Sequence, residues 1–113
     1  MNHNKLHCAV TIRIFGEDKC FGPGVAELLE RVDELKSLRK ATQHMQMAYS
    51  KAWRMIKVAE KNLGFRLLES STGGKGGGGA ELTPEARAFL VSYRFFENKV
   101  RQYAEESFNE IFG

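Results

Sequence analysis

Apolar and polar positions alternate near the start of the chain, whereas apolar positions recur at helical spacing further on. On one face of the run from Cys8 to Phe15, positions 8, 10, 12 and 14 are apolar or cysteine. Such alternation is typical of a strand, and Gly16-Glu17-Asp18 turns the chain back into Lys19-Cys20-Phe21. The pattern predicts a small β-hairpin over residues 8–21.

Helical spacing begins after Gly22-Pro23-Gly24, where positions 25, 28, 29, 32 and 35 are Val or Leu. This predicts an amphipathic helix over residues 23–36. Ser37 has the side chain of an N-cap for a second helix that runs to about Gln46. Ser50 has the side chain of an N-cap for a third helix, which is expected to run from Lys51 to about Asn62 and to end at Gly64. With a turn at residues 47–49, the segment 37–62 predicts a helix-turn-helix.

A glycine-rich loop separates two short β-like segments, Phe65–Glu69 and Ala80–Leu82, and residues 66–82 therefore predict a wing. Thr83-Pro84 is a strong helix start, and no breaker follows before Gly113, so a helix is expected over residues 83–112. The fold class is mainly α with a small β component. We predict a single winged helix-turn-helix domain over residues 1–113, with an N-terminal hairpin and a long C-terminal dimerisation helix.

The distribution of charge along the chain is uneven, and it indicates which part of the domain binds a partner. The net charge of the 113 residues is only +3, but residues 31–66 hold nine Lys or Arg against three Asp or Glu, a local net charge of +6. Residues 81–113 hold four basic and six acidic side chains, a net charge of −2. A positive middle and a mildly acidic tail predict one face for a polyanion and another for a different contact.

The third predicted helix has an apolar face, with Ala52, Ile56 and Ala59, and an opposite face that carries a hydroxyl and three cations. Arg can hold guanine through two hydrogen bonds, and Lys pairs with phosphate oxygens. Together with the start of the preceding helix, these positions form the predicted DNA-binding set: Ser37, Arg39, Lys40, Tyr49, Ser50, Lys51, Arg54, Lys57 and Lys61. An ordinary solvated lysine-rich face is the alternative. For Trp53, the wheel favours a structural place at the helix–helix boundary over contact with a thymine methyl group.

The loop from Ser70 to Gly79 lacks the spacing of a phosphate-binding P-loop, and no helix starts directly after it. Between two strands, its glycines allow the backbone to lie close to a sugar-phosphate chain, and Lys75 supplies charge. Lys75 therefore joins the predicted DNA-binding set. A purely disordered linker is the alternative.

The last helix carries apolar and aromatic residues in near-heptad steps and is longer than one small domain can cover. A homodimer is therefore predicted through this helix, and the alternative is a helix packed wholly on its own domain. The predicted dimerisation residues are Phe89, Leu90, Tyr93, Phe96, Val100 and Tyr103.

Other classes of function receive little support. No pair of carboxylates, Cys/His cluster or Ser/His/Asp set has a suggestive spacing, so no enzyme activity, metal site or cofactor is expected. Cys8 and Cys20 are interpreted as two reduced thiols. The chain has no apolar run that could span a bilayer, and its polar start lacks the core of a signal peptide, so no membrane partner and a cytoplasmic location are expected.

The residues also resemble a known family. The run from Ser37 through Met45-Gln-Met-Ala-Tyr-Ser-Lys-Ala-Trp53 to Leu67-Leu68-Glu69 is similar to the winged helix-turn-helix of LysR-type regulators. The wing from Thr72 to Thr83 resembles that of the molybdate-responsive ModE regulators in particular. In that family this domain binds promoter DNA as a dimer, and a separate domain senses molybdate. Because the chain ends at Gly113, the sensing domain is expected to be absent, and the effector stays undetermined.

One position departs from the family pattern: Thr42 stands where LysR-type sequences usually have alanine. A buried hydroxyl bonded to its own helix accommodates this change.

The sequence thus predicts a stand-alone transcriptional regulator that binds double-stranded DNA as a homodimer, with its third helix in the major groove and its wing on the backbone. A protein-interaction module built from the same fold and the aromatic C-terminal helix is the alternative. A small oxyanion-binding protein for molybdate is a third hypothesis.

Overall fold

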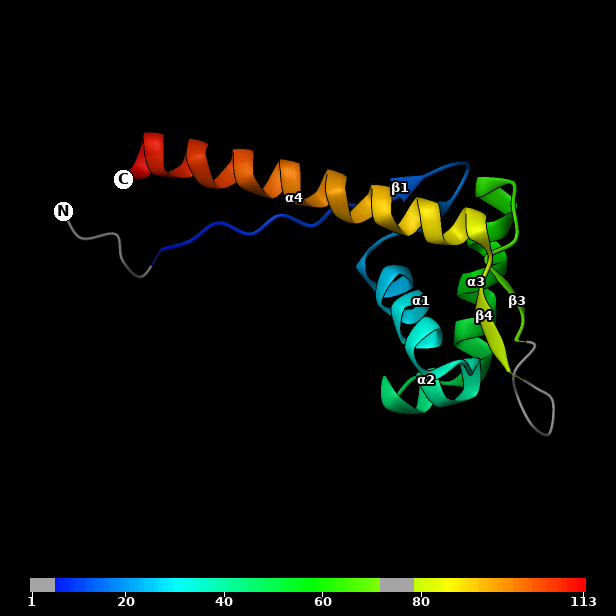
Figure 1. The fold of residues 1–113 in the computed structure, drawn as a ribbon. Coiled ribbons are helices and arrows are strands. Elements are labelled where there is room, and N and C mark those ends of the chain that lie inside the picture. Colours follow the sequence, from blue (N-terminus) through cyan, green and yellow to red (C-terminus); the bar gives the residue numbers. More distant parts are fainter. Residues whose placement is uncertain (1–5, 72–78) are drawn as a thin grey trace.

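The computed structural model describes residues 6–71 and 79–113, and it has the expected order of helices and short strands (Figure 1). The elements are β1 (Ile14–Phe15), β2 (Lys19–Phe21), α1 (Pro23–Leu35), α2 (Leu38–His44), α3 (Tyr49–Leu63), β3 (Leu68–Ser70), β4 (Ala80–Leu82) and α4 (Pro84–Phe112). Two antiparallel pairs, β1–β2 and β3–β4, are the only sheets within the described residues. The predicted fold class, a mainly helical winged helix-turn-helix, is confirmed.

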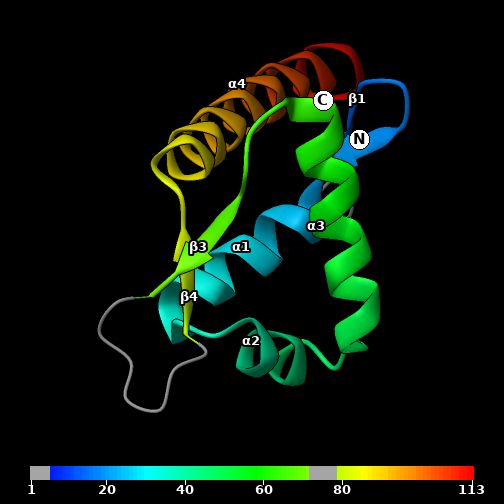
Figure 2. The ribbon, with the colours of Figure 1, turned by 90° about the vertical axis from the view of Figure 1, so that its right-hand side faces the viewer.

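The core is built around α1, because α3 lies on one side of this helix and the β3–β4 pair on the other (Figure 2). Leu28, Leu29 and Val32 of α1 are fully buried. The N-terminal part of α4 covers the end of this layer, where Phe21 packs edge-on against Phe89 and Tyr93 at centroid distances of 4.8 and 4.9 Å. Every helix therefore contributes one apolar face to a single core.

The N-terminal hairpin is shorter than predicted. Alternation correctly indicates which side chains face inward, since positions 8, 10, 12 and 14 are half-buried and the residues between them are exposed. However, only Ile14–Phe15 pairs with β2, because β2 has three residues before Pro23 begins α1. The preceding segment runs beside α4 (Figure 1), and the Tyr93 hydroxyl donates a hydrogen bond to the Ile12 carbonyl oxygen at 2.8 Å.

The turn of the helix-turn-helix lies earlier than predicted. The second helix ends at His44, and Gln46 adopts a left-handed conformation with φ of 54°, which reverses the chain. As a result α3 begins at Tyr49 with Ala48 as its N-cap, and the expected capping role of Ser50 is wrong. Thr42 is buried, and its hydroxyl donates to the Arg39 carbonyl oxygen at 2.7 Å, as expected for a hydroxyl bonded to its own helix.

The wing and the last helix are joined by a network around Thr83. The Thr83 hydroxyl donates to the Arg66 carbonyl oxygen at 2.6 Å and accepts from the Ala86 N–H at 3.0 Å, which caps α4. The first wing strand begins at Leu68 rather than Phe65, because Phe65 turns inward to pack near Phe89. Beyond the core, α4 continues as a long projecting rod (Figure 1).

Candidate nucleic-acid interface

The sequence of α3 places one face in the core and turns the opposite face to solvent. Ala52, Ile56 and Ala59 have no exposed surface and pack against the rest of the domain. The predicted DNA-binding residues of this helix are all exposed: Tyr49, Ser50, Lys51, Arg54, Lys57 and Lys61. At the far end, Gly64 adopts φ of 84° and ends the helix, a conformation that glycine adopts without strain.

The end of α3 is fixed by Asn62, whose side-chain oxygen accepts from the Glu17 N–H at 2.8 Å. Glycine at position 16 leaves room for this approach, since a Cβ atom there would meet the Asn62 side chain. The hairpin therefore holds the C-terminal end of α3, while the helix-turn-helix holds its N-terminal end.

A row of two aromatic rings, each with a cation over its face, runs from α2 along α3. The Arg39 guanidinium lies 4.7 Å from the centre of the Tyr49 ring, and Lys57 Nζ lies 5.1 Å from the centre of the Trp53 ring. The two rings meet edge to face at a centroid distance of 6.3 Å. The preference for Trp53 at a helix–helix boundary is not supported, because 38% of this residue is exposed. Its spacing of four residues from Tyr49 is the signal that could have identified the pair.

The start of α2 lies near the start of α3. The Ser37 hydroxyl accepts a hydrogen bond from the Lys40 N–H at 3.1 Å, so this side chain caps α2. Arg39 and Lys40, which follow it, are exposed. Ser37 therefore organises the helix start, and the two cations are the groups that can reach a phosphate.

A groove of about 390 Å3 separates the α2–α3 unit from the wing. Arg39, Tyr49 and Trp53 line one side, and Arg66 and Glu69 lie among the wing residues that line the other. Sequence reasoning missed Arg66, because nothing in the local pattern places it opposite α3. The predicted contact residue Lys75 lies outside the described residues.

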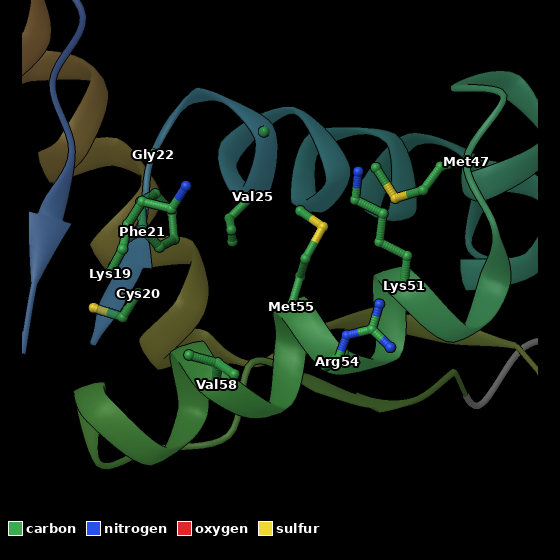
Figure 3. Close-up of a pocket in the computed structure, with 11 residues that line it drawn as sticks. Lys19, Cys20, Phe21, Gly22, Val25, Met47, Lys51, Arg54, Met55 and Val58 are labelled. Atoms are coloured by element: carbon green, nitrogen blue, oxygen red, sulfur yellow. The ribbon is translucent and has the colours of Figure 1, made fainter. Parts of the chain in front are cut away.

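A second groove, of about 520 Å3, lies between α3 and the start of α1 (Figure 3). Met55 points across it from α3 toward α1, while Lys51 and Arg54 lie along the α3 side. Both cations thus line this second groove, and neither lines the groove beside the wing.

The cations of this surface differ in how far neighbouring acids neutralise them. Lys57 Nζ lies 3.5 Å from a Glu60 oxygen. Within residues 6–71 and 79–113, no acidic side chain is within ion-pair distance of Arg39, Lys40, Lys51, Arg54 or Lys61. These five side chains therefore keep their positive charge available for an anionic partner.

Away from this face, ion pairs bind α4 to α1. The Arg94 guanidinium donates to both Glu30 carboxylate oxygens, at 2.8 and 3.0 Å, and to Glu97 at 2.8 Å. These hydrogen bonds raise the pKa of Arg94, those to Glu30 most strongly. Arg87 pairs with Asp33 at 2.8 Å, and this bond lowers the pKa of the Asp33 carboxyl. Glu30 and Asp33 of α1 are thus each paired with an arginine of α4.

The predicted dimerisation residues divide into two groups. Leu90 and Tyr93 are buried and Phe89 is half-buried, all within the core of the single chain. Burial raises the pKa of the Tyr93 hydroxyl, which is engaged with Ile12. Phe96 and Tyr103 are exposed, and Val100 is half-buried on the projecting part of α4. The first three therefore serve the fold of one chain, which leaves the distal residues for any contact with a second chain.

Both cysteines are free thiols, and burial raises the pKa of Cys20. The described residues contain no group of three or more His, Cys, Asp or Glu placed to hold a metal ion. None of the helices described combines the length and hydropathy needed to cross a lipid bilayer.

A family model described as bacterial regulatory helix-turn-helix protein, lysR family, matches residues 25–87, from the first turn of α1 to the first turn of α4. The chain belongs to this family. The matched segment includes α2, α3 and the wing, which are the elements that carry the exposed cations.

Two ModE proteins are similar to this LysR-family chain. The molybdenum transport protein ModE of Herbaspirillum seropedicae is 33% identical over 72 residues, which are 64% of the chain and 27% of that protein. The transcriptional regulator ModE of Haemophilus influenzae is 33% identical over 75 residues, 66% of the chain and 29% of that protein. The chain thus spans a little over a quarter of the length of these relatives.

A solved structure shares the fold. The DNA-binding domain of CbnR, in a complex with DNA, is 23% identical, with a TM-score of 0.59 over 78% of the chain and 95% of that domain. At this identity the likeness establishes the architecture of the LysR-family chain and no more.

Proposed function

We propose that this LysR-family chain is a sequence-specific DNA-binding transcriptional regulator that places α3 in the major groove. The observation that carries the proposal is the outward face of α3, where exposed Lys51, Arg54 and Lys61 lie opposite a fully buried apolar face. A helix held rigidly by its buried face can present these side chains to base edges and phosphates without further ordering.

The neighbouring elements support the same orientation. Arg39 and Lys40 at the start of α2 lie on the same end of the molecule as Tyr49 and Ser50 at the start of α3. The N-terminal part of a recognition helix is the part that contacts base edges in helix-turn-helix proteins. In this arrangement the α2 cations bind phosphates, Ser50, Lys51 and Arg54 contact bases, and the wing, with Lys75, follows the flanking backbone.

A homodimer through the distal part of α4 belongs to this proposal. Phe96 and Tyr103 are 50% and 73% exposed on a helix that projects beyond the core, and exposed aromatic surface of this extent is typical of an interface. Two copies joined in this way would present two α3 helices to two half-sites. The relatives named ModE and the DNA complex of the CbnR domain agree with a DNA-binding role.

Fluorescence anisotropy over a salt series tests the proposal. Duplexes from upstream of the protein's own and neighbouring genes are titrated beside random duplex of equal length. We expect tight binding to one fragment, with log affinity falling by about 0.9 per unit of log salt for each phosphate neutralised. Equal and weak binding to every duplex would contradict sequence specificity, and the absence of binding at low salt would contradict a DNA-binding function altogether.

A further inference from the structure

Tyr49 and Trp53 are large aromatic residues that the fold leaves on its surface. They are 36% and 38% exposed, whereas the buried side of α3 is supplied by small and aliphatic side chains. Neither residue belongs to the apolar core, so core packing does not account for the part of each ring that is exposed.

The two rings are nevertheless held in fixed positions. They meet edge to face at 6.3 Å, and each has a cation over its face, Arg39 at 4.7 Å and Lys57 at 5.1 Å. Cation–π contacts restrict both rings, and both residues line the groove beside the wing. The aromatic pair is thus ordered before any partner arrives.

The order of groups in this row matches the chemistry of a major groove. From Tyr49 to Lys57 the row covers nine residues of helix, a rise of about 12 Å over eight steps of 1.5 Å. Arg39 lies over the ring at one end and Lys57, which also pairs with Glu60, over the ring at the other, so the apolar surface of the two rings lies between two cations. Among the base edges of the major groove, thymine alone presents an apolar group, the C5-methyl.

We propose that the Tyr49–Trp53 pair is the element that reads thymine, by packing against its C5-methyl group in each half-site. This inference rests on the proposed function. It assigns a base preference to residues of α3 other than the cations, and it separates two roles on the helix. Arg54 and Lys51 provide hydrogen bonds and charge, and the aromatic pair provides recognition of a methyl group.

Replacement of thymine by deoxyuridine tests this assignment, because deoxyuridine differs only by the missing methyl group. A tight duplex is first selected from a randomised library with the full chain, and each dT is then changed singly to dU. We expect one or two positions per half-site at which the wild-type affinity falls about fourfold, the effect of losing one buried methyl-sized group. At the same positions, Trp53→Ala and Tyr49→Ala should show a smaller loss, because the methyl no longer has its apolar partner.

Phe15→Ala is the matched control, because Phe15 is an exposed aromatic residue in the hairpin at the other end of α3. It should keep the full wild-type sensitivity to dU. Circular dichroism confirms the fold of each variant, and weakened variants are compared at lower salt, where phosphate contacts maintain binding.

Two results would overturn the inference while leaving DNA binding intact: no dT position responds to dU in the wild type, or the response persists undiminished in both alanine variants. Failure to select any duplex would instead reject the proposed function, and the inference with it.

Discussion

The Glu60 carboxylate of α3 accepts a hydrogen bond at 2.8 Å from the main-chain N–H of Leu67, at the entrance to the wing. Leu67 is fully buried, so this N–H has no access to water. The other Glu60 oxygen lies 3.5 Å from Lys57 Nζ on the outward face of α3. One side chain therefore links the position of the wing to the surface that we propose reads DNA.

Loss of this acceptor should destabilise the domain. We expect Glu60→Ala to lower the free energy of unfolding by about 1–3 kcal/mol, because a buried N–H loses its partner. Glu60→Gln retains an acceptor oxygen, so its free energy of unfolding should fall by less. Urea denaturation of the three proteins measures the difference, and equal stability of Glu60→Ala and wild type would contradict the structural role of this bond.

Charge reversal at Arg54 should weaken DNA binding without affecting the fold, because this exposed side chain has no acidic partner in the described part of the chain. For Arg54→Glu we expect a loss of more than tenfold, about 1.4 kcal/mol or more, in affinity for the selected duplex. Arg13→Glu, in the N-terminal segment, reverses an exposed cation outside α3 and outside the proposed dimer interface, and it serves as the control. If both variants lose affinity equally, only general electrostatic attraction is at work.

Acidic substitutions on distal α4 should separate the dimer into monomers. Phe96→Glu with Tyr103→Glu places two charges in a proposed apolar interface, where burial of unpaired charge is unfavourable. Sedimentation velocity should show a dimer for the wild type and a monomer for the double variant, with helical circular dichroism retained. Phe15→Glu should remain dimeric. A wild-type monomer, or a double variant that stays dimeric, would reject this interface.

The Asp33–Arg87 pair predicts a specific dependence of stability on acid. The hydrogen bond from Arg87 holds the pKa of Asp33 below its ordinary value of 3.8, and the charges of Arg87 and Lys36 lower it further. Because the folded-state pKa is the lower one, the contribution is fully present above the unfolded pKa and is lost as pH falls through the folded pKa.

At neutral pH, Arg87→Ala should therefore be less stable than wild type by about 0.5 kcal/mol, the modest value of an exposed pair. The difference should shrink in urea titrations at pH well below 3.8. Arg87→Lys keeps the positive charge, so its stability at neutral pH should lie between those of Arg87→Ala and the wild type. A gap that stays constant down to low pH would show that Arg87 acts through packing rather than through Asp33.

Some features of the interface could be predicted because they depend on local order in the chain. Outward placement of Arg54 and Lys51 follows from the helical period, which puts Ala52, Ile56 and Ala59 on the other side. Thr83-Pro84 marks the start of α4 for an equally local reason, since the threonine hydroxyl caps the helix within its own first turn.

Other features depend on which distant segment covers a given face. Leu90 and Tyr93 belong to the same apolar stripe as the distal residues of α4, and only the tertiary structure, which buries both and packs Phe21 against Tyr93, assigns them to the core of one chain. Arg66 lines the same groove as Trp53 because the tertiary fold brings the segment before β3 beside α3.

By itself, then, the sequence determined the helices, their outward charges and the family of the fold, because periodicity and capping act over a few neighbouring residues. Only the tertiary structure decided that Trp53 is a surface residue beside a groove, and that the N-terminal strand pairs over two residues. Both outcomes depend on contacts between segments far apart in the chain, where an apolar side chain is buried only if another element reaches it.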